Sequence, residues 1–177
     1  LDAGSYTVTL TATDNAGNTD TAATAVTVVP GETGQQAVWT GRGDGRSWFD
    51  SNNWNTAHFP GPGASVTVTG AAQVVLSDST AVLTSLVISN NATLVFTNWN
   101  TALYADALTV GAKGTVTCAG PFRNEEMSNN VVLVCGSFVL GAGGKIDLNG
   151  KGYAGAKGYD AQGHGPGGSV SSGNNGG

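Results

Sequence analysis

The sequence predicts an all-β fold built around a right-handed parallel β-helix, and two observations carry this prediction. One eleven-residue pattern occurs four times, at Val66–Leu76, Leu86–Phe96, Leu108–Cys118 and Phe138–Leu148, with starts 20, 22 and 30 residues apart. In each copy apolar residues occupy positions one, three, nine and eleven, with Gly, Asn or Ser in the gap. Alternation by two indicates a strand with one buried face, and the gap indicates a turn.

Each copy is too short to bury its own apolar face, so we expect it to stack on the next copy, as in a solenoid. Val66, Leu86, Leu108 and Phe138 would then lie one above another inside, as would the three equivalent sets. The alternative is a β-sandwich made of hairpins, because strand, turn, strand also describes a hairpin. The β-helix is favoured because the same inward residue types recur at the same four places.

Composition limits the class of protein. The chain has 177 residues with a charged content of 11 %, 28 Gly and a net charge of −5, which suits an extracellular all-β protein. The few basic residues are scattered, so nucleic-acid binding has little support. No apolar run reaches the roughly 20 residues of a membrane span. The chain begins inside a strand-like run without a signal peptide, so we expect a piece of a longer protein.

Residues 1–29 predict strands around a polar turn. Tyr6, Val8 and Leu10 alternate with threonines, Asp14–Asn18 has turn chemistry, and Ala25–Val29 is a second strand. The run resembles the closing strands of bacterial Ig-like and PKD-type domains. The resemblance implies Ig-like strands that need partners, because two or three strands cannot close a core. Residues 30–36 are predicted to be a linker.

Residues 37–63 contain Trp39, Trp48 and Trp54 among turn residues. Three exposed tryptophans would make a large apolar patch, so we predict that this segment caps the first coil. With Asn53 and Pro60, the run resembles the Trp-rich segment that precedes β-helical, autotransporter-like repeats in large bacterial surface proteins.

Oxygen-bearing side chains cluster in this segment and suggest a calcium site. Its candidate ligands are Asp44, Asp50, Asn52 and Asn53. Calcium prefers such oxygens, but the spacing is not that of an EF-hand loop. Hydrogen bonding within turns is the favoured use of these side chains. Calcium is the one cofactor that the sequence suggests.

The coils are assigned to residues 64–149, and their connections carry the other candidate sites. Trp99 and Tyr104 lie on a polar connection and are weak candidates for stacking on sugar rings, with packing on the coil edge favoured. Cys118 and Cys135 are 17 residues apart, close to one coil, so they are candidates to stack and form a disulfide. Buried free thiols are the equal alternative.

A long insertion, Ala119–Asn130, precedes an expected extra strand at Val131–Cys135. Few charged groups are candidates for catalysis: Arg123, Glu125, Glu126, Lys145, Asp147, Lys151 and Asp160. No acid/base arrangement stands out among them, and Lys145 and Asp147 are expected to face outward. We therefore expect no enzymatic activity in this chain.

Residues 150–177 are Gly-rich and lose the apolar alternation, so they have no core of their own to bury. They resemble Gly-rich runs that continue after β-helix coils in giant bacterial surface proteins. The favoured function is an extracellular structural or adhesive module, with filament assembly as one version. The expected partners are other copies or surface glycans. The alternative is a β-helix that binds or degrades polysaccharide, and fold alone does not decide between them.

Overall fold

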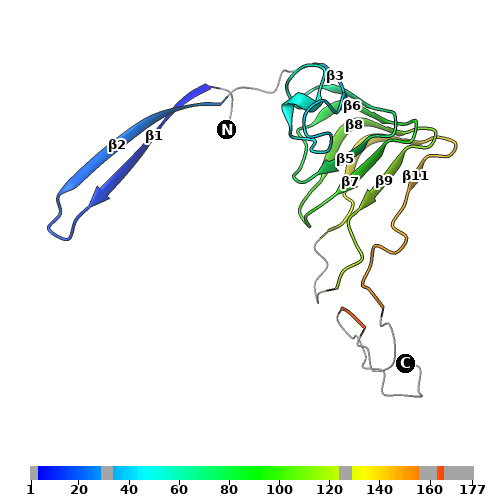
Figure 1. Cartoon of the computed structure of the whole chain (residues 1–177). Helices are drawn as coiled ribbons and strands as arrows, with labels where there is room; N and C mark the ends of the chain where they lie inside the picture. Colours follow the sequence, from blue (N-terminus) through cyan, green and yellow to red (C-terminus); the bar gives the residue numbers. More distant parts are fainter. Residues whose placement is uncertain (1–3, 29–33, 124–128, 156–162, 166–177) are drawn as a thin grey trace. The chain divides into compact units, whose positions relative to one another are not determined.

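The computed structural model describes residues 4–28, 34–123, 129–155 and 163–165. The chain divides into two compact units, Leu1–Gly31 and Glu32–Gly177, and each is described by itself. Apart from one 3-10 helix, η1 (Ser51–Asn53), every regular element in the described part of the chain is a β-strand (Figure 1). The predicted all-β class is therefore confirmed.

The first unit is an antiparallel hairpin of β1 (Gly4–Thr13) and β2 (Thr19–Val28). Its turn has the predicted polar chemistry, because Oδ1 of Asp14 accepts backbone N–H groups from two and four residues on, at 2.8 and 2.9 Å. Val8 and Leu10 are exposed. Two strands alone offer no second layer to cover such side chains.

The second unit contains two sheets in which neighbouring strands run parallel. One sheet has the order β10-β8-β6-β4-β3 and consists of β3 (Gln36–Val38), β4 (Ser65–Val68), β6 (Leu83–Ile88), β8 (Leu103–Val110) and β10 (Leu133–Leu140). The other has the order β11-β9-β7-β5 and consists of β5 (Gln73–Leu76), β7 (Thr93–Phe96), β9 (Thr115–Cys118) and β11 (Lys145–Ile146). The chain passes from one sheet to the other at every turn of the repeated pattern.

Residues at positions one, three and nine of the four copies are Cα partners, so successive copies pair in parallel register, and the β-helix itself stays a prediction. In the first sheet the partners run Val66, Leu86, Leu108, Phe138, and in the second they run Val74, Leu94, Val116, Ile146. The two strands of one copy belong to different sheets, so the hairpin pairing of the alternative is not formed in these copies. Two facing sheets are still consistent with a β-sandwich in the broad sense of two packed layers.

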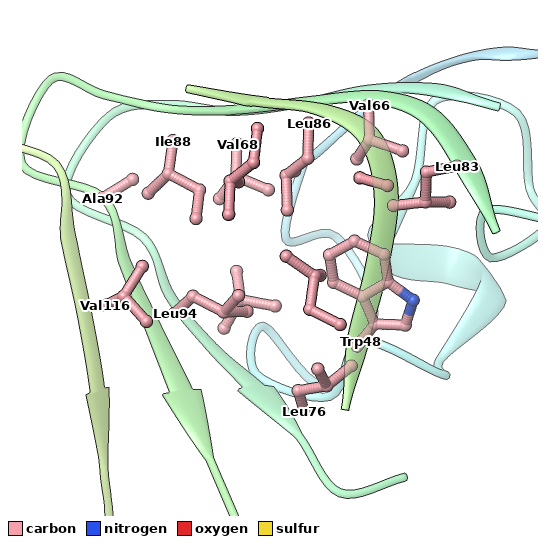
Figure 2. Packing of buried hydrophobic residues seen from close by; sticks show 14 of the residues in the cluster. Trp48, Val66, Val68, Leu76, Leu83, Leu86, Ile88, Ala92, Leu94 and Val116 are labelled. Atoms are coloured by element: carbon pink, nitrogen blue, oxygen red, sulfur yellow. The ribbon is translucent and has the colours of Figure 1, made fainter. Parts of the chain in front are cut away.

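The core lies between the two sheets. Figure 2 shows Val68 and Ile88 on one side facing Leu94 and Val116 on the other, with Trp48 beside them. All five side chains are fully buried. Val68, Ile88, Leu94 and Val116 come from alternate positions of their strands, as the period of two in the sequence requires.

The turn inside each copy has special backbone requirements. Gly70, Asn90 and Lys113 have φ values of +77°, +55° and +58°. Such values suit Gly and Asn and are uncommon for other residues. In the third copy a Cβ on Gly114 would collide with the carbonyl oxygen of Ile88, so the turn of one copy sits directly on the backbone of the copy before it.

The last copy differs from the prediction in two ways. Its four apolar residues are not inside: Phe138, Leu140, Ile146 and Leu148 are 42 %, 51 %, 41 % and 48 % exposed. In the described part of the chain, β10 and β11 are the last strands of their sheets, so no further strand pairs with their outer edges there. The predicted separate strand at Val131–Cys135 is also wrong, because Leu133–Leu140 is one continuous strand.

The opposite end of the stack is closed by residues 35–59. β3 pairs with β4, and Val75 of β5 exchanges backbone hydrogen bonds with Arg46 (2.8 Å) and Trp48 (3.0 Å). Both sheets therefore have a partner at this edge. Trp48 is fully buried, and its ring packs edge-on against Trp54 at a centroid distance of 4.9 Å.

Candidate functional site

Trp99 lies in the connection between β7 and β8, and hydrogen bonds to neighbouring connections hold it in place. Asn98, with a φ of +70°, donates its backbone N–H to Oδ1 of Asn129 at 2.7 Å. Its Nδ2 donates to the carbonyl oxygen of Ser77 at 2.6 Å. These bonds tie three successive connections together, so the 49 % exposed ring of Trp99 is presented by a fixed loop.

A cavity of about 340 Å³ lies beside Trp99, and its walls are predominantly apolar. Its lining comes from several separate segments: Trp99, Cys118, Asn129, Asn130, Val131, Leu148, Lys151 and Gly152. Ligand pockets in proteins span about 300–1,000 Å³ and are mostly apolar with a few placed polar groups. The cavity is therefore at the small end of that range and has room for a ring-sized ligand.

The polar groups of the cavity are few and distinct. Oδ1 of Asn130 is buried without a hydrogen-bond partner, a state that costs about 1–3 kcal/mol. Burial raises the pKa of the Cys118 thiol above its ordinary 9.0, and the positive charge of Lys151 opposes this rise. The cavity is thus bordered by one neutral thiol and one nearby cation, whereas the unsatisfied oxygen of Asn130 is buried behind its wall.

Tyr104 is not among the residues that line this cavity. It lies in β8, where its Cα partner is Val134 and its backbone N–H donates to Oγ1 of Thr80 at 2.9 Å. The two aromatic residues singled out in the sequence, Trp99 and Tyr104, therefore do not share this site. Stacking of either ring on a sugar stays a prediction.

Among the predicted calcium ligands, Asn53 is fully buried and organises the loop before η1. Its Oδ1 accepts the N–H groups of Gly43 (3.0 Å) and Gly45 (2.9 Å). Its Nδ2 donates to Oδ1 of Asp44 (2.7 Å) and to the carbonyl oxygen of Ser47 (2.9 Å). One amide therefore makes four hydrogen bonds, two accepted and two donated, and uses all of its capacity.

The carboxylates of Asp44 and Asp50 also accept hydrogen bonds from groups within this loop. The hydrogen bond from the Ser47 amide, with help from Asn53, lowers the pKa of Asp44 below its ordinary 3.8. Asp50 accepts the N–H groups of Asp44 (2.7 Å) and Asn52 (3.0 Å). These groups make the turn hydrogen bonds favoured from the sequence, and calcium binding stays a prediction. The described residues include no cluster of three or more His, Cys, Asp or Glu suited to a metal.

Cys118 and Cys135 are free thiols in this structure. Cys118 is the partner of Phe96 in one sheet, whereas Cys135 is the partner of Ala105 in the other. The expected stacking of the two cysteines is wrong, because the chain changes sheets between β9 and β10. Cys118 is buried and Cys135 is half-buried, and the choice between a disulfide and free thiols stays a prediction.

The groups considered for catalysis form no common site in the described part of the chain. Glu125, Glu126 and Asp160 lie outside the described residues. Lys145 and Asp147 face outward as expected and form an ion pair with Nζ and Oδ2 3.0 Å apart. The hydrogen bond from Lys145 lowers the pKa of Asp147. The absence of enzymatic activity stays a prediction.

Sequence reasoning missed most of the cavity, namely Asn130, Val131, Leu148 and Lys151. They are separated from Trp99 by 31 to 52 positions, so no local motif connects them. Trp99 was a signal as an aromatic residue in an otherwise polar connection, whereas Cys118 and Lys151 were singled out for other reasons. Stacking of consecutive connections, which follows from the parallel register, is what brings these segments together.

The fold and the site define an all-β domain with parallel strands and an open cavity on one flank. The G8 domain model matches residues 53–156, more than half of the chain, and the chain therefore belongs to the G8 domain family. Domains of this family are typically found in extracellular proteins, in agreement with the expected location. Comparison with curated proteins and with solved structures finds no match. No helix in the described residues is long and apolar enough to cross a membrane.

Proposed function

We propose that the chain is a structural and adhesive module of a large extracellular protein, built from coils of a right-handed parallel β-helix. In-register parallel partners and the change of sheet at each turn support successive coils. The Ig-like or PKD-type origin of the β1–β2 hairpin and a place on a bacterial surface belong to the same proposal. They rest on the sequence resemblance.

The observation that carries this function is the difference between the two ends of the stack. At one end Trp48 and the paired edge strands cover the core. At the other end the apolar rows of the fourth copy are exposed and the outer edge of β10 is unpaired in the described residues. An unpaired apolar strand edge is a template for another strand. The open end is therefore the adhesive surface, and a second copy is its occupant in the isolated protein.

This geometry favours a closed dimer over the filament considered from the sequence. A filament needs two different surfaces that bind each other, whereas two identical open ends meet about a two-fold axis. Two β10 edges would then pair antiparallel, with Phe138 and Leu140 covered by the same rows of the partner. The Trp-rich end leaves no equivalent edge for further growth.

Sedimentation velocity of the 177-residue chain over a range of concentrations tests this proposal. We expect a monomer–dimer equilibrium that shifts to monomer when Phe138 and Leu140 are both replaced by Lys. The matched control is Leu10→Lys, which changes the most exposed apolar side chain of the hairpin, 70 % exposed, and should leave the dimer intact. A wild-type chain that stays monomeric, or a dimer lost only with Leu10→Lys, would refute the open end as the adhesive surface.

The alternative, a module that binds or degrades polysaccharide, has weaker support. Trp99 and Tyr104 do not line the same cavity, and Lys145 and Asp147 neutralise each other at the surface. Glycan-array binding that disappears with Trp99→Ala in a folded chain would favour this alternative.

A further inference from the structure

The edge strand β10 has nearly the same sequence in both directions. Its eight residues, from Leu133 to Leu140, are Leu-Val-Cys-Gly-Ser-Phe-Val-Leu. Read from either end, the strand starts with Leu and Val, has Cys or Phe in third place and Gly or Ser in fourth. It has no charged residue and no Pro, which edge strands commonly use to prevent pairing. Such a strand is complementary to a second copy of itself that runs in the opposite direction, as a two-fold interface requires.

The side chains of β10 have the same symmetry. Four of them point into the space between the two sheets, because their Cα partners in β8 are buried. They are Leu133, Cys135, Phe138 and Leu140. This inward set is symmetrical about the middle of the strand. An antiparallel pair of β10 strands that is centred there therefore sets every inward side chain opposite an inward side chain of the second copy.

The backbone of β10 leads to the same register. The carbonyl oxygen of Val132 and the N–H of Gly141 both form hydrogen bonds to β8, at 2.9 Å. Alternate residues of a strand direct their backbone groups to opposite edges, so those of Leu133 and Leu140 face the outer edge. In the described residues no strand pairs with that edge. In the centred register Leu133 lies opposite Leu140, so that two residues with outward-facing backbone groups meet.

We propose that two copies join through β10 in this one register, with Leu133 opposite Leu140 and Cys135 opposite Phe138. The proposal rests on the proposed adhesive function of the open end and gives that end a specific partner, an identical chain. Any other antiparallel register over the whole strand sets an inward side chain opposite an outward one. The two-fold axis passes through the middle of the strand.

The side chains that meet in this register differ in size in a favourable way. The ring of Phe138 lies opposite the small side chain of Cys135 on each side of the axis, so the two rings do not compete for the same space. Leu140, now half exposed, packs on the half-buried Leu133. Apolar cross-strand pairs of this kind stabilise antiparallel sheets.

Oxidative cross-linking of the 177-residue chain tests the register. The background is Cys118→Ala, because the chain has two cysteines and this change leaves Cys135 as the one natural thiol. Phe138→Cys should then form a disulfide with Cys135 of the second copy when diamide is added as the oxidant. Opposite residues of a hydrogen-bonded antiparallel pair are about 5.5 Å apart at Cα, within the range of a disulfide. Within one chain the two positions are about 10 Å apart, too far to be bridged.

Non-reducing electrophoresis measures the covalent dimer, and mass spectrometry of the linked peptides identifies the bond. Val139→Cys is the matched control, because Val139 is adjacent to Phe138 and also exposed but faces outward. In the proposed register it lies opposite Val134 and should not join to Cys135. The Cys118→Ala chain alone should not cross-link either, since the two Cys135 residues are three positions apart across the axis.

A second measurement keeps the aromatic ring in place. Val134 and Val139 face outward and lie opposite each other in the proposed register. Lys at both positions should weaken the dimer at least about tenfold relative to Val134→Glu with Val139→Lys, because like charges directly opposite repel and unlike charges attract. Two added lysines bring the net charge of −5 closer to zero, so overall repulsion does not explain this loss. Sedimentation velocity gives both dissociation constants, and high salt should reduce the difference.

The outcomes separate the register from the adhesive function. A dimer in which Phe138→Cys forms no disulfide with Cys135, or in which Val139→Cys forms one as readily, would overturn the register alone. A dimer that both charge combinations affect equally would do the same. A wild-type chain that stays monomeric would refute the adhesive function and the register together.

Discussion

The two ends of the paired sheets contain the same kind of apolar rows in opposite surroundings. In the row that begins at Val68, Ile88 and Val110 are fully buried, whereas Leu140 is half exposed. All four occupy position three of their copies. The first end is covered by Trp48 and its loop, and the last end has no neighbour in the described residues.

This difference shows that burial in a stacked fold is set by neighbouring copies as much as by the side chain itself. An apolar residue in a strand can be covered by its own sheet partners and by the facing sheet, but only when both continue past it. Leu140 has a partner on one side, whereas Ile88 has one on each. The same residue type therefore contributes differently to stability at the two positions.

The sharpest test of this comparison is a charge at the same position of two copies. Ile88→Asp should unfold the chain, because it places an unpaired carboxylate in a fully buried row and costs more than about 4 kcal/mol. Leu140→Asp should cost about 1 kcal/mol, since its carboxylate keeps contact with water. Urea denaturation followed by far-ultraviolet circular dichroism at low protein concentration measures both.

Val87→Asp is the control, because Val87 is next to Ile88 but is only partly buried on the outer side of β6. The Val87→Asp variant should unfold at nearly the same urea concentration as the wild-type chain. Equal damage from Ile88→Asp and Leu140→Asp would mean that the open end is covered in solution. Equal damage from Ile88→Asp and Val87→Asp would contradict the assignment of inner and outer faces.

A second test concerns the four side-chain hydrogen bonds of Asn53 at the closed end. Asn53→Ala removes four hydrogen bonds made by a fully buried side chain and leaves the N–H groups of Gly43 and Gly45 and the carboxylate of Asp44 without this partner. We expect a loss of about 2–4 kcal/mol in the free energy of unfolding. Asn52→Ala, an exposed neighbour in the same 3-10 helix, should cost less than about 0.5 kcal/mol.

If Asn53→Ala lowers the free energy of unfolding no more than Asn52→Ala does, the closed end does not depend on the hydrogen bonds of Asn53. Added calcium gives a further check on the same residues. A rise in melting temperature with calcium that Asp44→Asn abolishes would support the cation site suggested by the sequence.

Much of the fold follows from the sequence because the apolar residues recur at fixed positions within each short copy. Apolar positions one, three, nine and eleven fix the strands, and the same residue types at equivalent places fix the parallel register. The exposure of Phe138 and the continuity of β10 do not follow, since both depend on what surrounds the last copy. The cavity does not follow either, because Trp99, Asn130 and Lys151 meet only through stacking of connections of unequal length.

The smallest expected effect is on acid unfolding. It compares the carboxylate of Asp44 at the closed end with that of Asp147 at the open end. The pKa values of Asp44 and Asp147 are both below the ordinary 3.8 in the folded chain. A lowered folded-state pKa stabilises the protein above the unfolded value, and this stabilisation is lost as pH falls through the folded value. The melting temperature should therefore fall as pH is lowered from about 5 to about 3.

Asp44→Asn should lower the melting temperature at neutral pH and flatten this fall, because Asp44 accepts hydrogen bonds from backbone amides and buried Asn53. Asp147→Asn should change the acid profile less, since its partner Lys145 is exposed and screened by solvent. Calorimetry of the three proteins at several pH values measures the difference. A larger change from Asp147→Asn would mean that the open end, rather than the hydrogen-bonded loop at the closed end, controls acid stability.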